Sequence, residues 1–285
     1  MAALRFAIVD VFTDRPLAGN QLAVFTDARA VDAGTMQALA LEVGFSETTF
    51  VLPPESGGHA RIRIFNPLHE MAFAGHPVLG TAFVLAASLQ LGAIVLETGA
   101  GLVEVALERD DTGRIVFGRM VQPVPAVRPV ERAEELLAAV GAPRSELPVE
   151  LYDNGATHVF VTLESEDAVA ALPRPDAAAI ASFAVTGVNV VAGSGDRWKA
   201  RMFWPSGEDP ATGSAAGPLA CHLARHGVVE WGTEIVISQG VEVGRPSTLY
   251  ARADGRDGEI LRVTCGGSAV VVARGEFRLP ASELS

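Results

Sequence analysis

Short apolar runs alternate with stretches of helical spacing along the first ninety residues, and each pattern predicts a type of element. The apolar-rich runs Phe6–Phe12 and Leu22–Phe25 are separated by a turn containing Pro16 and Gly19, which predicts a hairpin or meander of two strands. Two further runs of the same kind predict strands at Thr48–Leu52 and Ala60–Phe65. The chain therefore begins with strand structure rather than with a helical bundle.

Two helices are predicted between these strands. Asp32 can cap a helix over about 33–43, and Gly44 stands where a helix commonly ends in the left-handed conformation. A second helix is predicted to follow Gly75-His76-Pro77, because proline fits the first turn of a helix. Apolar residues then occur around most of its circumference as far as Leu89, so this helix is expected to be buried on nearly all sides.

A proline-rich connector near the midpoint predicts a division into two halves. Residues 122–129 contain Pro123, Pro125 and Pro129, a composition that favours an extended segment over the interior of an element. We therefore expect an N-terminal half over 1–122 and a C-terminal half over 123–285, with a last strand that crosses back to the first half.

An internal repeat gives the clearest evidence for this division. Residues 61–84 align with residues 199–222 without a gap, at a constant offset of 201 − 63 = 138. The identical pairs are Arg63/Arg201, Phe65/Phe203, Pro67/Pro205, Glu70/Glu208, Gly75/Gly213 and Ala82/Ala220. Because 285 is close to twice 138, the simplest interpretation is duplication, with strand, loop, glycine and buried helix in each half. Glu70 and Glu208 are then expected to pair with Arg63 and Arg201.

Composition excludes several classes of protein. The chain is 49% hydrophobic and 20% charged over 285 residues, which is typical of a globular protein and not of a disordered or fibrous one. Its net charge of −12 leaves no basic surplus for nucleic acid or an anionic membrane surface. Two cysteines, Cys221 and Cys265, are too few for a disulfide framework or a structural zinc site. Without a signal peptide or a long apolar run, a cytoplasmic location is expected.

The repeat also indicates where chemistry is expected. In each half it places a glycine, Gly75 or Gly213, at the start of a helix, where free backbone N–H groups and the helix dipole favour an anion. If the halves face each other, a pocket between them would suit a small carboxylate. Such local attraction would allow an acidic protein to bind an acidic ligand.

Four polar side chains are candidates for catalysis or binding, and three of them stand near these helix starts in the sequence. His76 follows Gly75, while Asp209 and Ser214 flank Gly213, and together they could position, protonate and deprotonate a substrate. His76 could instead be a helix-turn histidine bonded to backbone, and Ser214 could be a cap. Asp209 aligns with Met71 in the repeat, an asymmetry that favours a function. Glu47, between a helix end and a strand, is either a surface charge or a partly buried base with raised pKa.

These residues resemble a known family. The runs around Glu47 (Phe45-Ser46-Glu47-Thr48-Thr49-Phe50), around Gly75 (Phe73-Ala74-Gly75-His76-Pro77-Val78-Leu79-Gly80) and from Glu208 to Ala215 are similar to the PhzF family of phenazine-biosynthesis isomerases. The resemblance covers essentially the whole chain. It extends from Asp10-Val11-Phe12 and Pro16-Leu17-Ala18-Gly19-Asn20 through Asn154–Phe160 to Gln239–Ser247.

The resemblance implies an α/β (α+β) fold of the diaminopimelate-epimerase type, with two pseudo-symmetric halves, each a curled mixed sheet around a central helix. It implies a homodimer and isomerisation of trans-2,3-dihydro-3-hydroxyanthranilate without metal or organic cofactor. Glu47 would move a proton from C3 to C1, and His76 and Asp209 would hold and polarise the hydroxyl and amino groups. The amides around Gly75 and Gly213, with Ser214, would bind the carboxylate.

The chain departs from the family pattern at two places, and of three alternatives two remain open. The loop between Pro205 and Glu208, only Ser206-Gly207, is shorter than usual, which bears on the placement of Asp209; Gln21 replaces a common proline. Two-thiol racemisation is excluded because Ala74 and Thr212 occupy the positions of the paired cysteines. A related isomerase acting on another small cyclic or amino-acid-derived carboxylate, and a non-catalytic ligand-binding protein, stay open.

Overall fold

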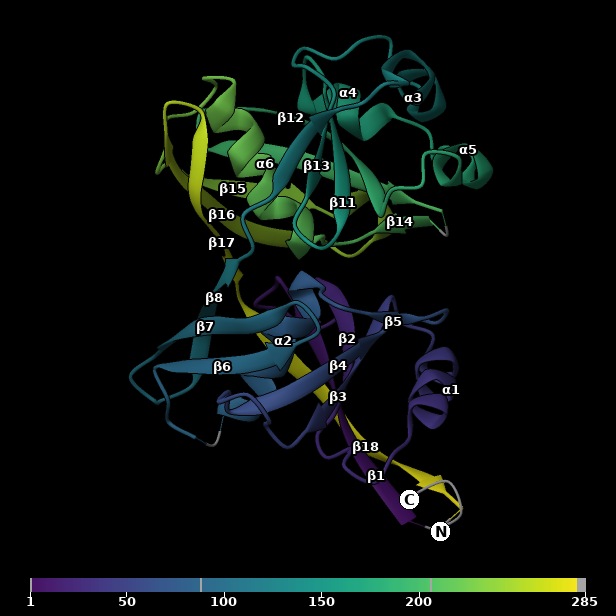
Figure 1. Ribbon diagram of the computed structural model, residues 1–285, viewed down its shortest axis with the longest axis vertical. Coiled ribbons are helices and arrows are strands. Elements are labelled where there is room, and N and C mark those ends of the chain that lie inside the picture. The colour runs from purple at the N-terminus through teal and green to yellow at the C-terminus, as the bar shows by residue number, and fades with distance from the viewer. Residues whose placement is uncertain (1, 88, 206, 281–285) are drawn as a thin grey trace. The chain divides into compact units, whose positions relative to one another are not determined.

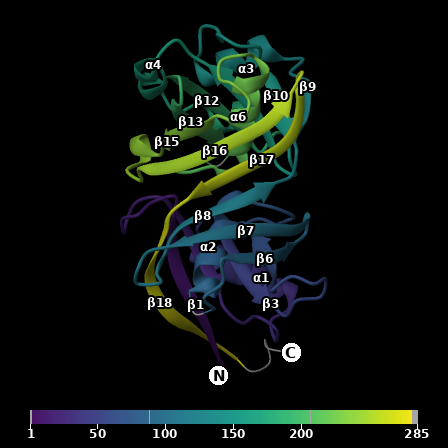
Figure 2. The same ribbon diagram turned by 90° about the vertical axis from the view of Figure 1, so that its left-hand side faces the viewer.

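The computed structural model describes residues 2–87, 89–205 and 207–280, which form two compact units (Figure 1). Unit 1 falls within Met1–Met120 and Gly266–Ser285, and unit 2 is Val121–Cys265. The sequence-based division at residue 122 differs by two residues. The sequence-based division also assigned the C-terminal segment to the second half, although its last strand was expected to cross back to the first half. That strand, β18 (Ala269–Leu279), pairs antiparallel with β1 (Ala2–Val11) along its length (Figure 2).

Unit 1 carries the elements predicted from the first ninety residues. The helix α1 runs over Ala33–Val43, with the Asp32 carboxylate accepting a hydrogen bond from the Thr35 backbone and Gly44 in the left-handed conformation. Both predicted caps are therefore confirmed. The remaining elements of this unit are β2 (Asn20–Phe25), β3 (Glu47–Leu52), β4 (Ala60–Phe65), β5 (Glu70–Met71), α2 (Gly75–Ala86), β6 (Ala93–Thr98), β7 (Gly101–Arg109) and most of β8 (Ile115–Gln122).

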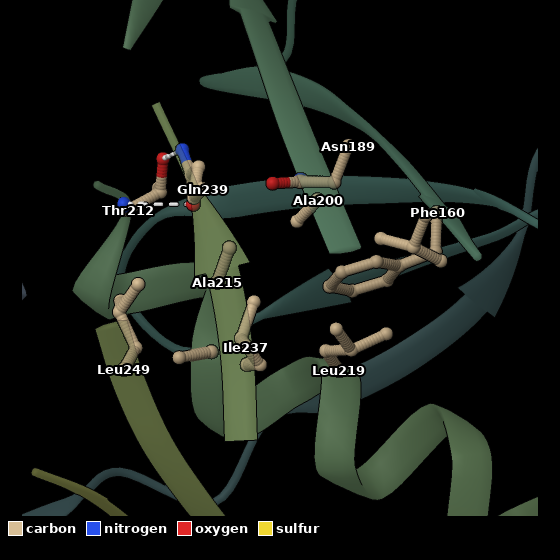
Figure 3. Close-up of a pocket in the computed structure, with 11 residues that line it drawn as sticks. Phe160, Asn189, Ala200, Thr212, Ala215, Leu219, Ile237, Gln239 and Leu249 are labelled. Atoms are coloured by element: carbon tan, nitrogen blue, oxygen red, sulfur yellow. Dashed lines mark hydrogen bonds between the residues drawn. The ribbon is translucent and has the colours of Figure 1, made fainter. Parts of the chain in front are cut away.

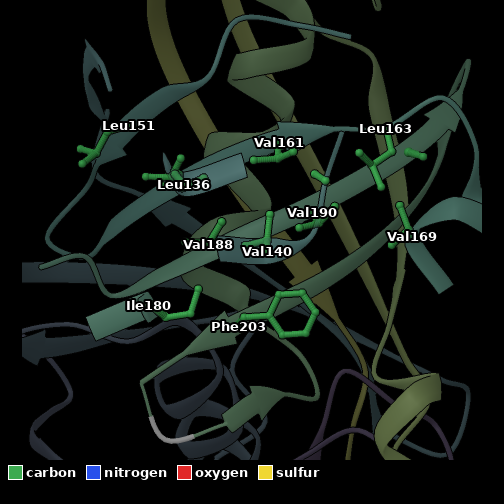
Figure 4. Packing of buried hydrophobic residues seen from close by; sticks show 13 residues of the cluster. Leu136, Val140, Leu151, Val161, Leu163, Val169, Ile180, Val188, Val190 and Phe203 are labelled. Carbon is green, nitrogen blue, oxygen red and sulfur yellow. The ribbon is translucent and has the colours of Figure 1, made fainter. Parts of the chain in front are cut away.

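Unit 2 is built from the elements β9 (Ala126–Pro129), α3 (Ala133–Val140), β10 (Glu150–Asp153), β11 (Thr157–Thr162), α4 (Glu166–Ala171), α5 (Ala177–Ala181), β12 (Gly187–Ser194), β13 (Arg197–Trp204), β14 (Gly207–Asp209), α6 (Gly213–Arg225), β15 (Glu234–Gln239), the 3₁₀ turn η1 (Val241–Val243), β16 (Ser247–Arg256) and most of β17 (Glu259–Gly267). A buried hydrophobic cluster lies between α3, α4, α5 and the strands β11 to β13 (Figure 4).

The two units repeat the same order of strand pairings, which confirms the duplication. In unit 1, β1–β2 is antiparallel, β2–β3 parallel, β3–β4 and β4–β5 antiparallel, β4–β6 parallel and β6–β7 antiparallel. In unit 2, β10–β11, β11–β12, β12–β13, β13–β14, β13–β15 and β15–β16 follow the same sequence of directions. Equivalent helices, α2 and α6, come after the fifth strand of each series.

The two equivalent helices form the centre of their units, as predicted for the first of them. Within α2, every residue except Leu85 is buried, and the helix contacts β1, β2, β3, β6, β7 and β18. Gly80 permits this approach, because a Cβ atom there would lie 2.7 Å from Leu22 Cδ2 and 2.8 Å from Val11 Cγ2. A continuous polar face on α2 would prevent such burial, and the sequence contains none.

Candidate active site

Glu47 and His76 lie together in unit 1. Glu47 is the first residue of β3, and His76 is the second residue of α2, so the two side chains come from the starts of their elements. Glu47 Oε2 lies 3.4 Å from His76 Nε2, and the side chains are 16% and 5% exposed. The structure thus brings together a carboxylate and an imidazole that are 29 residues apart in the sequence. His76 also forms a hydrogen bond with the Gln21 backbone, as the alternative of a helix-turn histidine expected.

Asn20 holds the other side of the His76 ring. The amide nitrogen of Asn20 lies 3.3 Å from His76 Nδ1, and its amide oxygen accepts a hydrogen bond from Ser46 Oγ at 3.2 Å. Nε2 is the ring nitrogen that faces Glu47, and the Gln21 backbone also forms a hydrogen bond with the ring. Burial lowers the pKa of His76 from 6.5 to about 3, so the ring is neutral near pH 7. It can orient and polarise a partner without itself titrating.

Asp209, Gly213 and Ser214 form a second group, in unit 2. Asp209 ends β14 and its carboxylate accepts a hydrogen bond from Thr212 Oγ1 at 2.6 Å. The Gln239 side chain binds both ends of this turn. It donates to the Asp209 carbonyl at 2.8 Å. It also accepts from the Thr212 backbone N–H at 3.2 Å (Figure 3). The neighbouring Ser206, part of the short loop noted in the sequence, lies outside the described residues.

Ser214 is surrounded by buried polar side chains. Its hydroxyl oxygen lies 2.9 Å from His158 Nε2, and its carbonyl accepts a hydrogen bond from the Asn154 amide at 2.9 Å. The other imidazole nitrogen of His158 lies 3.4 Å from the Asn189 amide nitrogen. His158 is fully buried, and burial lowers its pKa to about 3. Ser214 is the second residue of α6, after Thr212 at the N-cap position, so the alternative that it caps the helix is wrong.

Both helix starts lack a side-chain cap, as an anion site at these positions would require. Neither Ala74, before α2, nor Thr212, before α6, caps its helix with a side-chain hydrogen bond. The first backbone N–H groups of a helix have no partner within the helix, and the dipole there favours negative charge. Gly75 and Gly213 stand first in these helices and are buried.

Two ion pairs confirm the structural interpretation of the repeated glutamates. The Arg63 guanidinium donates two hydrogen bonds to Glu70, at 2.7 and 2.6 Å, and stacks over Phe65. Arg201 does the same with Glu208, at 2.8 Å for both bonds, and stacks over Phe203. Each ion pair joins the strand that carries the arginine to the short strand that follows it. Glu70 and Glu208 therefore have the same structural role, and Asp209 is the acid that differs between the repeats.

One group of three residues within 2–87, 89–205 and 207–280 could in principle ligate a metal: Glu150, His222 and His226. Its carboxylate is already engaged, because Glu150 Oε2 lies 2.9 Å from His226 Nε2 and 3.0 Å from both Arg225 Nη1 and the Tyr152 hydroxyl. Hydrogen bonds from His222, His226 and Tyr152 and the Arg225 charge lower the Glu150 pKa to about 2. This group ties β10 to the end of α6 as an ion-pair cluster.

Sequence reasoning did not single out four polar residues that complete these groups. Asn20, His158 and Gln239 appeared only inside motif runs, and Asn189 not at all. A signal was present for two of them, because Asn20 and His158 differ by the repeat offset of 138, as do His76 and Ser214. Asn189 and Gln239 lie within strands, where an isolated amide gives no pattern of its own. No helix in the described part of the chain is long and apolar enough to span a membrane.

The duplicated sheet-and-helix fold defines the class of protein. Known structures with this fold include a Bacillus anthracis phenazine biosynthesis protein of the PhzF family, with a TM-score of 0.85, 24% identity and coverage of 98% of this chain and 100% of the other. A predicted epimerase from Pseudomonas aeruginosa has a TM-score of 0.82 and 29% identity, covering 97% and 100%. A hydroxyproline epimerase from Agrobacterium vitis, at 15% identity, shares the fold with a TM-score of 0.64 over 96% and 92%. The chain therefore has the duplicated epimerase-like fold.

Sequence comparison then gives the family. The profile of the PhzC-PhzF family, described as phenazine biosynthesis-like protein, matches residues 9–275, and the chain belongs to this family. A trans-2,3-dihydro-3-hydroxyanthranilate isomerase from Pseudomonas chlororaphis is 49% identical over 277 residues, which cover 96% of this chain and 99% of the relative. The enzyme of the same name from Pseudomonas aeruginosa is 48% identical over 278 residues, with the same coverage.

Proposed function

We propose that this protein is a cofactor-independent isomerase of trans-2,3-dihydro-3-hydroxyanthranilate in phenazine biosynthesis. The observation that carries the proposal is the 3.4 Å contact between Glu47 and a neutral, buried His76, in a chain 49% identical to an enzyme of that name. A carboxylate that is mostly withdrawn from water beside an uncharged imidazole can exchange a proton with a bound carbon acid.

The proposed reaction moves one proton and two double bonds. Glu47 takes the proton from C3, the electron pair of that C–H bond shifts the ring double bonds, and the protonated Glu47 returns a proton to C1. The enol so formed at C3 tautomerises to the ketone. Substrate and product are isomers, so the step consumes no oxidant or reductant.

The remaining site residues have binding roles in this proposal. The neutral His76 and the Asp209 carboxylate would hold and polarise the hydroxyl and amino groups of the substrate. The backbone N–H groups at Gly75 and Gly213, with the Ser214 hydroxyl, would bind its carboxylate. Burial of Glu47 would need to raise its pKa far enough for the carboxyl to carry a proton during turnover, which stays a prediction.

The proposal extends to conditions and partners. We expect a homodimer in the cytoplasm that acts on a small carboxylate without metal or organic cofactor and does not bind nucleic acid or membranes. The charge of −12 supports the last expectation. The two-thiol chemistry that the epimerase-like fold can also support has no place here, since Ala74 and Thr212 precede the two helices.

The test is direct incubation of the purified chain with trans-2,3-dihydro-3-hydroxyanthranilate, followed by ultraviolet absorbance and proton NMR of the ring. We expect loss of the C3–H signal and a new signal at C1 within the lifetime of the sample. A folded protein that leaves this compound unchanged but isomerises another small cyclic carboxylate would refute the substrate assignment. No turnover of any such acid would favour a non-catalytic ligand-binding protein.

A further inference from the structure

The hydrogen bonds around His158 fix where its proton lies. The Asn189 amide nitrogen lies 3.3 Å from the Val159 carbonyl and 3.4 Å from His158 Nδ1. A carbonyl can only accept, so the Asn189 atom between these two groups is the NH₂ donor and not the amide oxygen. His158 Nδ1 therefore accepts, and the imidazole proton is on Nε2, 2.9 Å from Ser214 Oγ.

This proton in turn fixes the role of the Ser214 hydroxyl. The Ser214 oxygen accepts from His158 Nε2, so its own O–H must donate to another group. The Ser214 carbonyl is held separately by Asn154 at 2.9 Å. All four side chains are buried, with exposed fractions of 0% for His158, 2% for Asn189, 3% for Asn154 and 8% for Ser214. Neutral His158 suits this task, because a charged ring would also need an acceptor at Nδ1.

Unit 1 contains the same connection with different residues. Asn20 and His158 are separated by the repeat offset, and so are His76 and Ser214. In unit 1 the strand residue Asn20 lies against the helix residue His76, and in unit 2 the strand residue His158 lies against the helix residue Ser214. At both places a residue on the second strand of the series orients the second residue of the buried helix.

We infer that His158 is a positioning residue, which donates from Nε2 to Ser214 Oγ and thereby directs the Ser214 O–H toward the carboxylate of a bound ligand. This inference rests on the proposed function only for the identity of that ligand. It assigns to His158 no contact with the reacting atoms. Asn189 donates to Nδ1 of His158. It thereby keeps the imidazole proton on Nε2, which donates to Ser214.

The first experiment tests the tautomer without any ligand. In a long-range proton–nitrogen NMR spectrum of the full chain labelled with ¹⁵N-histidine, at pH 7, we expect a protonated Nε2 and an unprotonated Nδ1 for His158. His158→Gln identifies the signals by their loss. A protonated Nδ1, or a doubly protonated ring, overturns the inference whether or not the protein is an isomerase.

The second experiment tests recognition of the carboxylate. The probes are 3-hydroxyanthranilate, which keeps the carboxylate and amino group of the proposed substrate, and 2-aminophenol, which lacks the carboxylate. For His158→Leu we expect the Kd of 3-hydroxyanthranilate to rise about tenfold, the size of one hydrogen bond to a charged group. The Kd of 2-aminophenol should stay unchanged, and His158→Gln, which keeps an N–H donor, should restore most of the loss.

The double variant separates positioning from a merely structural role. If His158 acts through Ser214, His158→Leu should have no further effect on the Kd of 3-hydroxyanthranilate once Ser214→Ala is present. Equal weakening of both probes, or full additivity of the two substitutions, would overturn the inference. A protein that shows the predicted tautomer and coupling but does not turn over the dihydrohydroxyanthranilate would contradict the proposed function alone.

Discussion

The starts of α2 and α6 are surrounded by equivalent elements, but different side chains stand at the equivalent places. In unit 1, β2, β3 and α2 contribute Asn20, Glu47 and His76; in unit 2, β11, β12 and α6 contribute His158, Asn189 and Ser214. The first group contains a carboxylate that faces a neutral imidazole. The corresponding strand of the second group presents an amide, which cannot take up a proton. Duplication thus supplied two buried helix starts without a side-chain cap, and the group at the first of them contains a carboxylate.

The largest effect is expected where this difference lies. Glu47→Gln keeps the size of the side chain and removes its ability to exchange a proton, so turnover should fall by about 10³-fold or more. The rate of loss of the C3–H signal measures it. Glu42→Gln on the exposed face of α1 is the matched control and should behave like wild type. Substantial turnover by a folded Glu47→Gln protein would show that the carboxylate in unit 1 is not needed for proton transfer. That result would contradict the one-base mechanism.

The two arginine–glutamate pairs offer a second comparison, in stability. Arg201 and Glu208 are 5% and 2% exposed, and Arg201 also donates to the Leu172 carbonyl, whereas Arg63 and Glu70 are 26% and 42% exposed. Removing one partner of a buried pair leaves an uncompensated charge, so Arg201→Ala should cost about 3–5 kcal/mol in the free energy of unfolding. Arg63→Ala should cost about 1 kcal/mol or less. Urea denaturation of both variants measures these free energies of unfolding. Equal losses in the two variants would show that burial does not make the Arg201–Glu208 pair more important for stability.

A smaller effect on the free energy of unfolding is expected when the pH is lowered. His76 and His158 have pKa values of about 3 in the folded state, against 6.5 without burial. Between these values the unfolded chain binds a proton that the folded chain does not, so stability is intact above pH 6.5 and falls as the pH decreases toward 3. Each histidine should account for about 2 kcal/mol of the loss between pH 7 and 5. Urea denaturation of wild type and of His158→Gln at pH 7 and pH 5 checks this. If the free energy of unfolding falls by the same amount in both proteins, His158 is not a neutral buried residue.

Much of this fold could be predicted from local patterns, because local chemistry fixes it. Asp32 and Gly44 delimit α1 through hydrogen bonding and backbone conformation alone, and the apolar circumference of α2 requires burial. The pairing of Arg63 with Glu70 followed from a repeat of identical residues. Each of these inferences uses residues close together in the sequence or matched by the repeat.

The polar groups behind the site residues could not be predicted in this way. The contact of Asn189 with His158 depends on the parallel pairing of β11 and β12, which no spacing within the sequence specifies. Gln239 reaches Asp209 and Thr212 because β15 lies beside β13. Such contacts arise from strand register, and a single polar residue inside an apolar strand does not reveal its partner.

The most direct test of the central claim, that Glu47 alone carries the proton, is the reaction of trans-2,3-dihydro-3-hydroxyanthranilate in deuterium oxide, followed by proton NMR at C1. With wild-type protein we predict product whose C1 receives the proton through Glu47, and the extent of deuterium there reports how freely this carboxyl exchanges with solvent. With Glu47→Gln we predict no enzyme-dependent product. Product formed by the Glu47→Gln protein at the wild-type rate, with full deuterium at C1, would show that solvent or another residue supplies the proton and would contradict the account.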